Sequence, residues 1–142
     1  MSARAGRTSG APLHPLHAVL LAGMVPLFLG ALLSDWAYSS TYEVQWINFA
    51  AWLNAGAMVF AGVALLWALI DLLRADRRER RSALYVLLLL GTFILGLVTA
   101  LVHSKDAWAT MPEGLILSII VALLAVAATW IGFSTLRAGD AR

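Results

Sequence analysis

Long apolar segments separated by short polar ones dominate the chain. Residues 18–34, 44–70, 83–102 and 115–136 contain no charged side chain. A helix needs about 20 apolar residues to cross a membrane, and a segment in lipid must satisfy its own backbone hydrogen bonds. The pattern therefore predicts an all-α protein, a polytopic transmembrane four-helix antiparallel bundle with helices at about 14–34, 46–73, 83–103 and 114–137.

The predicted bundle accounts for nearly the whole chain. Residues 14–137 form a single transmembrane domain, preceded by a disordered tail at 1–13 and followed by a short tail at 138–142. The connections between the predicted helices are too short to hold a folded domain. No repeat of 20–50 residues is visible.

Positive charges divide unevenly between the two sides of such a bundle. Of the 10 Lys and Arg residues, all nine arginines fall on the side of the termini, and only Lys105 falls on the other. Cytoplasmic loops carry an excess of Lys and Arg, so both termini and the 74–82 connection are predicted to be cytoplasmic. Six aromatic residues cluster near the opposite, external interface: Trp36, Tyr38, Tyr42, Trp46, Trp52 and Trp108.

The composition excludes several classes of protein. Hydrophobic residues make up 61% of the chain and charged residues 13%, against about 45–50% and about 25% in soluble domains. A disordered chain, a nucleic-acid-binding domain and a conventional soluble enzyme are excluded on this ground. The absence of cysteine excludes disulfides, iron–sulfur clusters and covalently attached haem.

A seam of small and ionisable residues follows each predicted helix. Contacts in left-handed bundles recur about every 3.5 residues, small residues let helices approach closely, and ionisable residues in spans face the bundle interior. The predicted seams are His14, His17, Leu21, Met24, Phe28, Ala31 and Asp35; Ala50, Asn54, Ala57, Ala61, Ala64, Ala68 and Asp71; Tyr85, Leu89, Thr92, Gly96, Thr99 and His103; and Ser118, Ala122, Ala125, Thr129, Gly132 and Leu136.

The seams place polar residues in two groups at opposite ends of the bundle. A carboxylate beside a histidine can share and relay a proton, so the external group is a candidate proton-binding or ligand-binding pocket. The alternative, which we favour, is a structural hydrogen-bonded pair with neighbouring polar residues linking the helices. The candidate external pocket comprises Asp35, Asn54, Thr99, His103 and Ser118, and the candidate cytoplasmic cluster comprises His14, His17 and Asp71. For that cluster we favour the alternative that the two histidines are interfacial residues at the helix start and that Asp71 balances the charge of the arginine loop.

The histidines do not form an evident cofactor site. His17 precedes Asp35 by 18 residues, which places it about 27 Å from the level of His103 at 1.5 Å per residue. The two cannot ligate one haem iron within a single chain. Ser104, His103 and Asp106 are merely adjacent in a polar loop and define no nucleophile with its base. The sequence therefore predicts no enzyme, no metal and no cofactor, with a b-type haem or quinone-linked electron carrier as the alternative.

Residues 14–36 carry a resemblance to a known family. They place a His-Pro pair, His14 and Pro15, at the start of the first helix, with His17 after it and Asp35 near the helix end. This arrangement resembles the bacterial membrane-protein family catalogued as domain of unknown function 2231. The resemblance implies a four-helix bundle in the bacterial inner membrane.

Further segments extend the resemblance over residues 14–132. Residues 69–73, 114–118 and 130–132 are similar to the family. Many relatives have a further histidine in a Val-His-Phe-Pro element of the first helix, where Ala22 stands here. Some relatives are encoded beside periplasmic quinoprotein dehydrogenases, so the resemblance implies a membrane partner for a redox enzyme.

Together these observations predict a small multi-pass inner-membrane protein that is a structural or accessory subunit of a larger, redox-linked complex. Its expected partners are the lipid bilayer and another membrane or periplasmic protein or a second copy of itself, and no nucleic acid. A b-type cytochrome is one alternative. A proton or small-solute pathway through Asp35, His103 and Asn54 is another.

Overall fold

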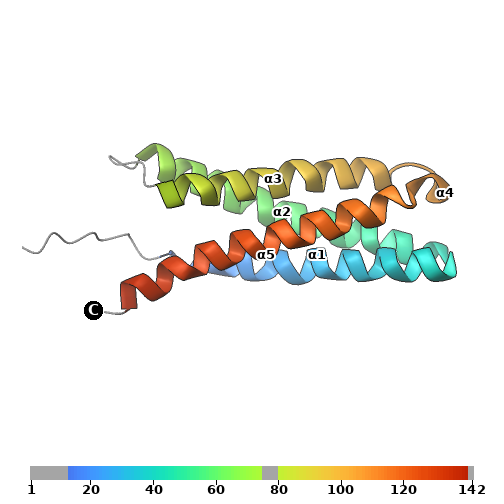
Figure 1. The fold of residues 1–142 in the computed structure, drawn as a ribbon, viewed down its shortest axis with the longest axis horizontal. Helices are drawn as coiled ribbons and strands as arrows, with labels where there is room; N and C mark the ends of the chain where they lie inside the picture. The colour runs from blue at the N-terminus through green and yellow to red at the C-terminus, as the bar shows by residue number, and fades with distance from the viewer. Residues whose placement is uncertain (1–12, 75–79, 141–142) are drawn as a thin grey trace, which may run out of the picture.

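A computed structural model describes residues 13–74 and 80–140. Four long helices run side by side in alternating directions, so that α1 begins and α5 ends at the same end of the bundle (Figure 1). The part of the chain that is described contains no strand, which confirms the all-α four-helix bundle. The helices are α1 (Pro15–Thr41), α2 (Val44–Arg74), α3 (Arg80–His103), α4 (Ala107–Thr110) and α5 (Glu113–Asp140).

Four of these helices are long and apolar enough to cross a membrane. The spans are Pro15–Thr41, Val44–Arg74, Ala83–His103 and Glu113–Ser134. Which end of the bundle faces the cytoplasm stays a prediction from the arginine distribution. We therefore name the two ends of the bundle by residues. The Asp35 end is the one at which α1 passes into α2, and the His17 end is the one at which α1 begins.

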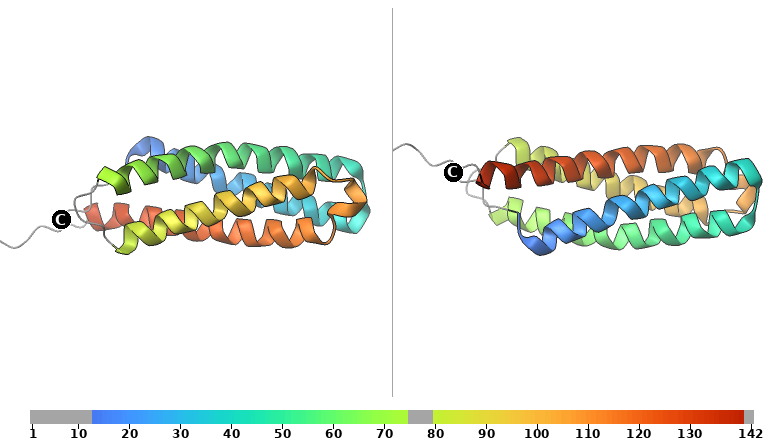
Figure 2. Two further views of the ribbon diagram at one scale, coloured as in Figure 1. Left: turned by 90° about the horizontal axis from the view of Figure 1, so that it is seen from above. Right: turned by 90° about the horizontal axis from the view of Figure 1, so that it is seen from below.

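The helices pack as a square in which each one contacts two neighbours. Helix α1 contacts α2 and α5, and α3 contacts the same two helices, so α1 and α3 face each other across the diagonal (Figure 2). The predicted seams fill the centre of this square. Leu21, Met24 and Leu89 are fully buried, as are the small residues Ala57 and Ala125.

Two seam positions were predicted wrongly. The side chains of His14 and Asp71 are exposed, because they lie beyond the last buried turn of α1 and α2, where Ala68 is the final buried residue of α2. The side chain of Leu136 lies outside the described residues. The seam rule therefore holds within the apolar spans and fails where they end.

Helix α1 is longer than predicted. It continues to Thr41 instead of ending at residue 34. In the added turns, Ser39 and Thr41 donate their hydroxyls to the carbonyl oxygens of Trp36 and Ala37 at 2.7 and 2.8 Å. The helix ends at Tyr42, which adopts a left-handed conformation with φ 54° and donates its backbone N–H to Tyr38.

The other helix boundaries also differ from the predicted ones. Helix α2 begins at Val44, α3 at Arg80, and α5 continues to Asp140, so most of the predicted tail at 138–142 is helical. The short helix α4 (Ala107–Thr110) was not predicted, because four residues are too few to show a periodic pattern. Of the predicted tail at 1–13, only Leu13 lies within the described residues. Arg77 and Arg78, in the middle of the 74–82 connection, lie outside them.

The two helical hairpins repeat the same pattern of burial. Two hydrogen bonds across the diagonal each join residues 68 apart, His17 with Tyr85 and Asp35 with His103. The same offset of 68 residues relates Leu21 on α1 to Leu89 on α3. It also relates seven further pairs of buried positions. They are Met24 and Thr92, Phe28 and Gly96, Ala31 and Thr99, Asn54 and Ala122, Ala57 and Ala125, Ala61 and Thr129, and Ala64 and Gly132.

This correspondence defines a parallel repeat. Helices α1 and α3 run in the same direction, as do α2 and α5, so a pseudo-two-fold axis along the bundle relates one hairpin to the other. Few of the paired residues are identical, and some differ greatly in size, as Phe28 and Gly96 do, so the repeat conserves burial at the seam and not residue type. This explains why no repeat is visible in the sequence.

Candidate functional site

The Asp35 end contains a buried acid–base pair. Asp35 of α1 and His103, the last residue of α3, lie diagonally opposite in the bundle. His103 Nε2 lies 2.7 Å from Asp35 Oδ1, and the two side chains are 2% and 0% exposed. This hydrogen bond therefore connects two helices that are not neighbours.

The geometry fixes the number of protons in the pair. His103 Nδ1 lies 2.8 Å from the Thr99 carbonyl oxygen, which can only accept, so Nδ1 carries a hydrogen. The 2.7 Å contact between Nε2 and Oδ1 then requires one further proton between them, because two lone pairs would otherwise face each other. The site holds that proton whether it is written as imidazolium and carboxylate or as imidazole and carboxylic acid, and either form has no net charge.

Ser118 completes the partners of the carboxyl group. This residue of α5 donates its hydroxyl to Asp35 Oδ2. The carboxyl group therefore lies in the centre, between a hydroxyl and an imidazole. In a catalytic triad the imidazole lies in the centre and activates the hydroxyl. The arrangement here links three helices and does not activate Ser118 as a nucleophile.

The other two residues predicted for this pocket have different roles. Thr99 contributes its backbone carbonyl, while its hydroxyl bonds to the Leu95 carbonyl oxygen at 2.7 Å. Asn54 donates to the carbonyl oxygen of Gly96 at 3.1 Å and links α2 to α3 separately. The structure thus brings four of the five residues together, whereas Asn54 forms a separate hydrogen bond between α2 and α3.

Gly114 forms part of this site and was missed from the sequence. A Cβ atom at Gly114 would lie 2.8 Å from Thr110 Cγ2 and 3.4 Å from His103 Cε1. The backbone of α5 therefore packs directly against the imidazole edge. In the sequence, this contact was indicated only weakly, by a glycine two residues after Pro112 at the start of an apolar segment.

The His17 end contains a second diagonal hydrogen bond. His17 Nε2 and the Tyr85 hydroxyl lie 2.5 Å apart, while His17 Nδ1 is buried and has no hydrogen-bond partner among the described residues. The Trp67 ring lies 5.1 Å from the ring of His14 and 5.6 Å from that of His17. No hydrogen bond joins the predicted trio of His14, His17 and Asp71. The sequence placed Tyr85 on the seam, but gave no signal for Trp67.

Apolar layers separate the two polar groups. Leu21, Met24, Phe28 and Leu89 are at most 2% exposed in the centre of the bundle. The Thr92 hydroxyl at this depth bonds back to its own helix, to the Leu88 carbonyl oxygen at 2.7 Å. No chain of polar side chains therefore joins the two ends in the described structure, and the buried histidines lie at opposite ends, where they cannot share one metal ion.

This fold and this site define a small polytopic membrane protein with a hydrogen-bonded polar group near each end of its bundle. The chain matches the model of the family described as predicted membrane protein (DUF2231) over residues 13–137, and it belongs to that family. The resemblance noted in the sequence is thereby confirmed. No curated protein and no solved structure matches the chain.

Proposed function

We propose that the protein is an accessory subunit of a complex in the bacterial inner membrane and that it binds a partner protein at its Asp35 end. The observation that carries this proposal is a stacked aromatic pair outside the spans. Tyr42 and Trp108 have ring centroids 5.3 Å apart and an interplanar angle of 19°. Tyr42 lies between α1 and α2, and Trp108 lies on α4.

The aromatic pair is both fixed and accessible. Tyr38, which is 1% exposed, contacts the Tyr42 ring edge-on at 5.8 Å and holds it against the bundle. Trp108 is 76% exposed. Rigid Tyr and Trp rings are the side chains that most often dominate the binding energy of protein interfaces.

Other exposed tryptophans at this end lie within the apolar spans and not outside them. Trp36 and Trp52 are 64% and 79% exposed, but they lie on the sides of α1 and α2 within the apolar spans. Aromatic side chains in that position form the belt at the membrane surface. They therefore serve as matched controls for the Tyr42–Trp108 pair.

The interior of the bundle supports an accessory role over a transport role. The polar group at the Asp35 end is satisfied by its own helices, and apolar layers close the centre. The described residues between α3 and α5 amount to α4 and its short flanks, which is too little chain for a catalytic domain. A partner protein outside the membrane would therefore bind at the end of the bundle.

The experiment compares W108A with W52A. Each protein is extracted from its own host membrane in polymer nanodiscs, and the stoichiometric co-purifying proteins are identified. We expect a partner that is retained by the wild type and W52A and lost from W108A. A wild-type protein that is extracted alone, or a partner that W108A retains equally, would contradict the proposal. A reduced-minus-oxidised visible spectrum of the same preparation tests whether the complex contains haem.

A further inference from the structure

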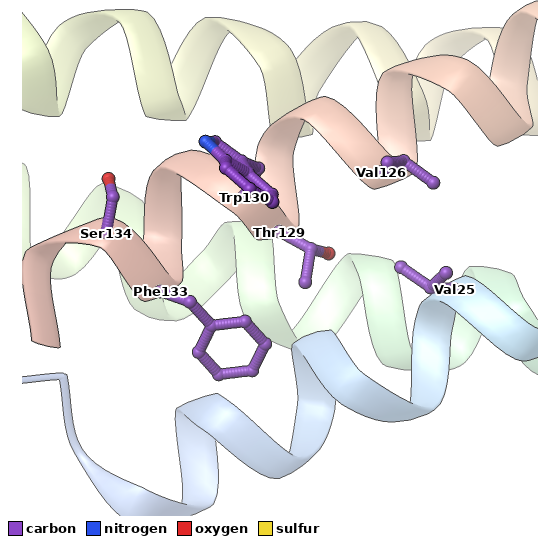
Figure 3. A pocket seen from close by; sticks show the side chains of 6 residues that line it. All are labelled: Val25, Val126, Thr129, Trp130, Phe133 and Ser134. Carbon is purple, nitrogen blue, oxygen red and sulfur yellow. The ribbon is translucent and has the colours of Figure 1, made fainter. Parts of the chain in front are cut away.

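A groove lies between α1 and α5, in the half of the bundle nearer the His17 end. It has a volume of about 330 Å³ and is lined by Val25 of α1 and by residues of α5. Val25 points toward α5, and the Thr129 side chain and the Phe133 ring extend toward α1 (Figure 3). The α5 residues that line it are Val126, Thr129, Trp130, Phe133 and Ser134.

One polar atom in this groove is buried without a partner. Thr129 is 9% exposed, and its Oγ1 has no hydrogen-bond partner among the described residues. Other threonines in the spans behave differently, because Thr92 and Thr99 each donate to the carbonyl oxygen four residues earlier at 2.7 Å. A buried hydroxyl without a partner costs free energy, so Thr129 is a donor available to a molecule in the groove.

The internal repeat shows how the groove differs from the equivalent contact between the other two helices. The equivalent of the α1–α5 contact is the contact of α3 with α2, where Phe93 occupies the position of Val25 and Gly62 that of Trp130. There a Cβ atom at Gly62 would lie 3.1 Å from the Phe93 ring, so an aromatic ring fills that position. Here the smaller side chain, Val25, is on α1 and the larger one, Trp130, is on α5, and Thr129 adds a hydroxyl where its counterpart is Ala61.

We propose that this groove binds a lipid-soluble molecule whose head is a planar ring bearing a carbonyl group, as in a membrane quinone. The ring lies in the groove between Val25 of α1 and the side chains of α5 that line it. The Thr129 hydroxyl donates to the carbonyl oxygen. Val126 and Trp130 are 43% and 72% exposed, so the groove opens at the lipid-facing surface and an apolar tail can leave through it.

Depth favours such a ring over a phospholipid. Thr129 lies eight residues before Arg137, the first charged residue after the uncharged segment 115–136, which is about 12 Å along the helix at 1.5 Å per residue. The ester carbonyl groups of phospholipids lie in the interfacial region, outside the hydrocarbon core. A carbonyl group on an apolar ring can reach the level of Thr129.

The test is binding of decylubiquinone to the full-length protein in phospholipid nanodiscs, followed by tryptophan fluorescence. We expect saturable quenching by the wild type. V25F should abolish it, because the new ring fills the groove, and T129V should weaken affinity roughly three- to tenfold for one lost hydrogen bond. The matched controls are V19F, on the exposed lipid-facing side of α1, and T92V, whose hydroxyl bonds within its own helix. Both should bind as the wild type does.

Three results would overturn the proposal. The first is the absence of saturable quenching in the wild type, and the second is its retention in V25F. The third is a phospholipid that native mass spectrometry finds on the wild type but not on V25F, and that decylubiquinone does not displace. The measurement needs no partner protein, so its outcome is independent of the proposed accessory role.

Discussion

The two ends of the bundle differ in how completely their buried polar groups are hydrogen-bonded. Each has a hydrogen bond between α1 and α3 that joins residues 68 apart. At the Asp35 end, both carboxyl oxygens and both imidazole nitrogens have partners. At the His17 end, the imidazole has one partner, and its Nδ1 has none among the described residues.

This difference indicates which end fixes the arrangement of the helices. A buried polar group that is fully satisfied tolerates only one geometry, whereas a partly satisfied one can shift at little cost. The Asp35 end joins α1, α3 and α5 at once. The hydrogen bond described at the His17 end joins α1 and α3, and the Trp67 ring of α2 also lies against His17. We infer that the Asp35 end sets the diagonal register and that the His17 end follows it.

The largest expected effect is that of D35A. This change leaves the His103 and Ser118 side chains buried without their partner, and each buried polar group left without a partner costs about 1–3 kcal/mol. D35N should cost less than about 1.5 kcal/mol, because the amide donates to Nε2 and its oxygen accepts from Ser118. Unfolding in mixed detergent micelles, followed by circular dichroism, measures both free energies.

D35A and D35N also serve as each other's control. If they destabilised the protein equally, the negative charge and not the hydrogen bonds would be what matters at this end. A cost of D35A below about 1 kcal/mol would show that the pair is not buried as described.

A smaller effect is expected from Y85F at the His17 end. The variant removes the hydroxyl that bonds to His17 Nε2 and keeps the ring. Polar contacts between membrane helices are worth about 0.6 kcal/mol on average and up to about 1.7 kcal/mol, so the free energy of unfolding should fall within that range. The same unfolding assay measures it. A loss as large as that of D35A would remove the distinction between the two ends.

The smallest effect should come from K105M. Lys105 and Glu113 form an ion pair at 3.3 Å at the Asp35 end, but their side chains are 50% and 62% exposed. Exposed pairs contribute about 0–1 kcal/mol and less in high salt. Unfolding at low and high ionic strength should therefore give nearly the same value for K105M and the wild type. A large, salt-insensitive loss would mean that exposed charges also hold this end together.

The seams of the four spans could be predicted from the sequence because burial in a bundle follows from helical spacing. Asp35, His103 and Ser118 were accordingly placed at one end, and the structure joins them. Spacing along one helix does not state the register between helices. The 68-residue offset across the diagonal, and the bond of Asn54 to a backbone carbonyl instead of to this group, were therefore not predictable.

Residues beyond the apolar spans were the least predictable. His14 and Asp71 follow the seam spacing but lie past the buried turns. The stacking of Tyr42 on Trp108 depends on a left-handed residue at the end of α1 and on the short helix α4. Both features come from loop geometry, which has no periodic signal.

The central claim is that Asp35 and His103 act as one unit across the diagonal of the bundle. A double-mutant cycle with D35A, H103A and the double variant, measured by unfolding in mixed micelles, tests it most directly. The account predicts that the double variant is about as stable as D35A alone, with a coupling free energy of about 2 kcal/mol or more, well above the usual value of about 0.6 kcal/mol for polar contacts between membrane helices. Additive losses, with a coupling near zero, would show that the two residues act independently and would contradict the account.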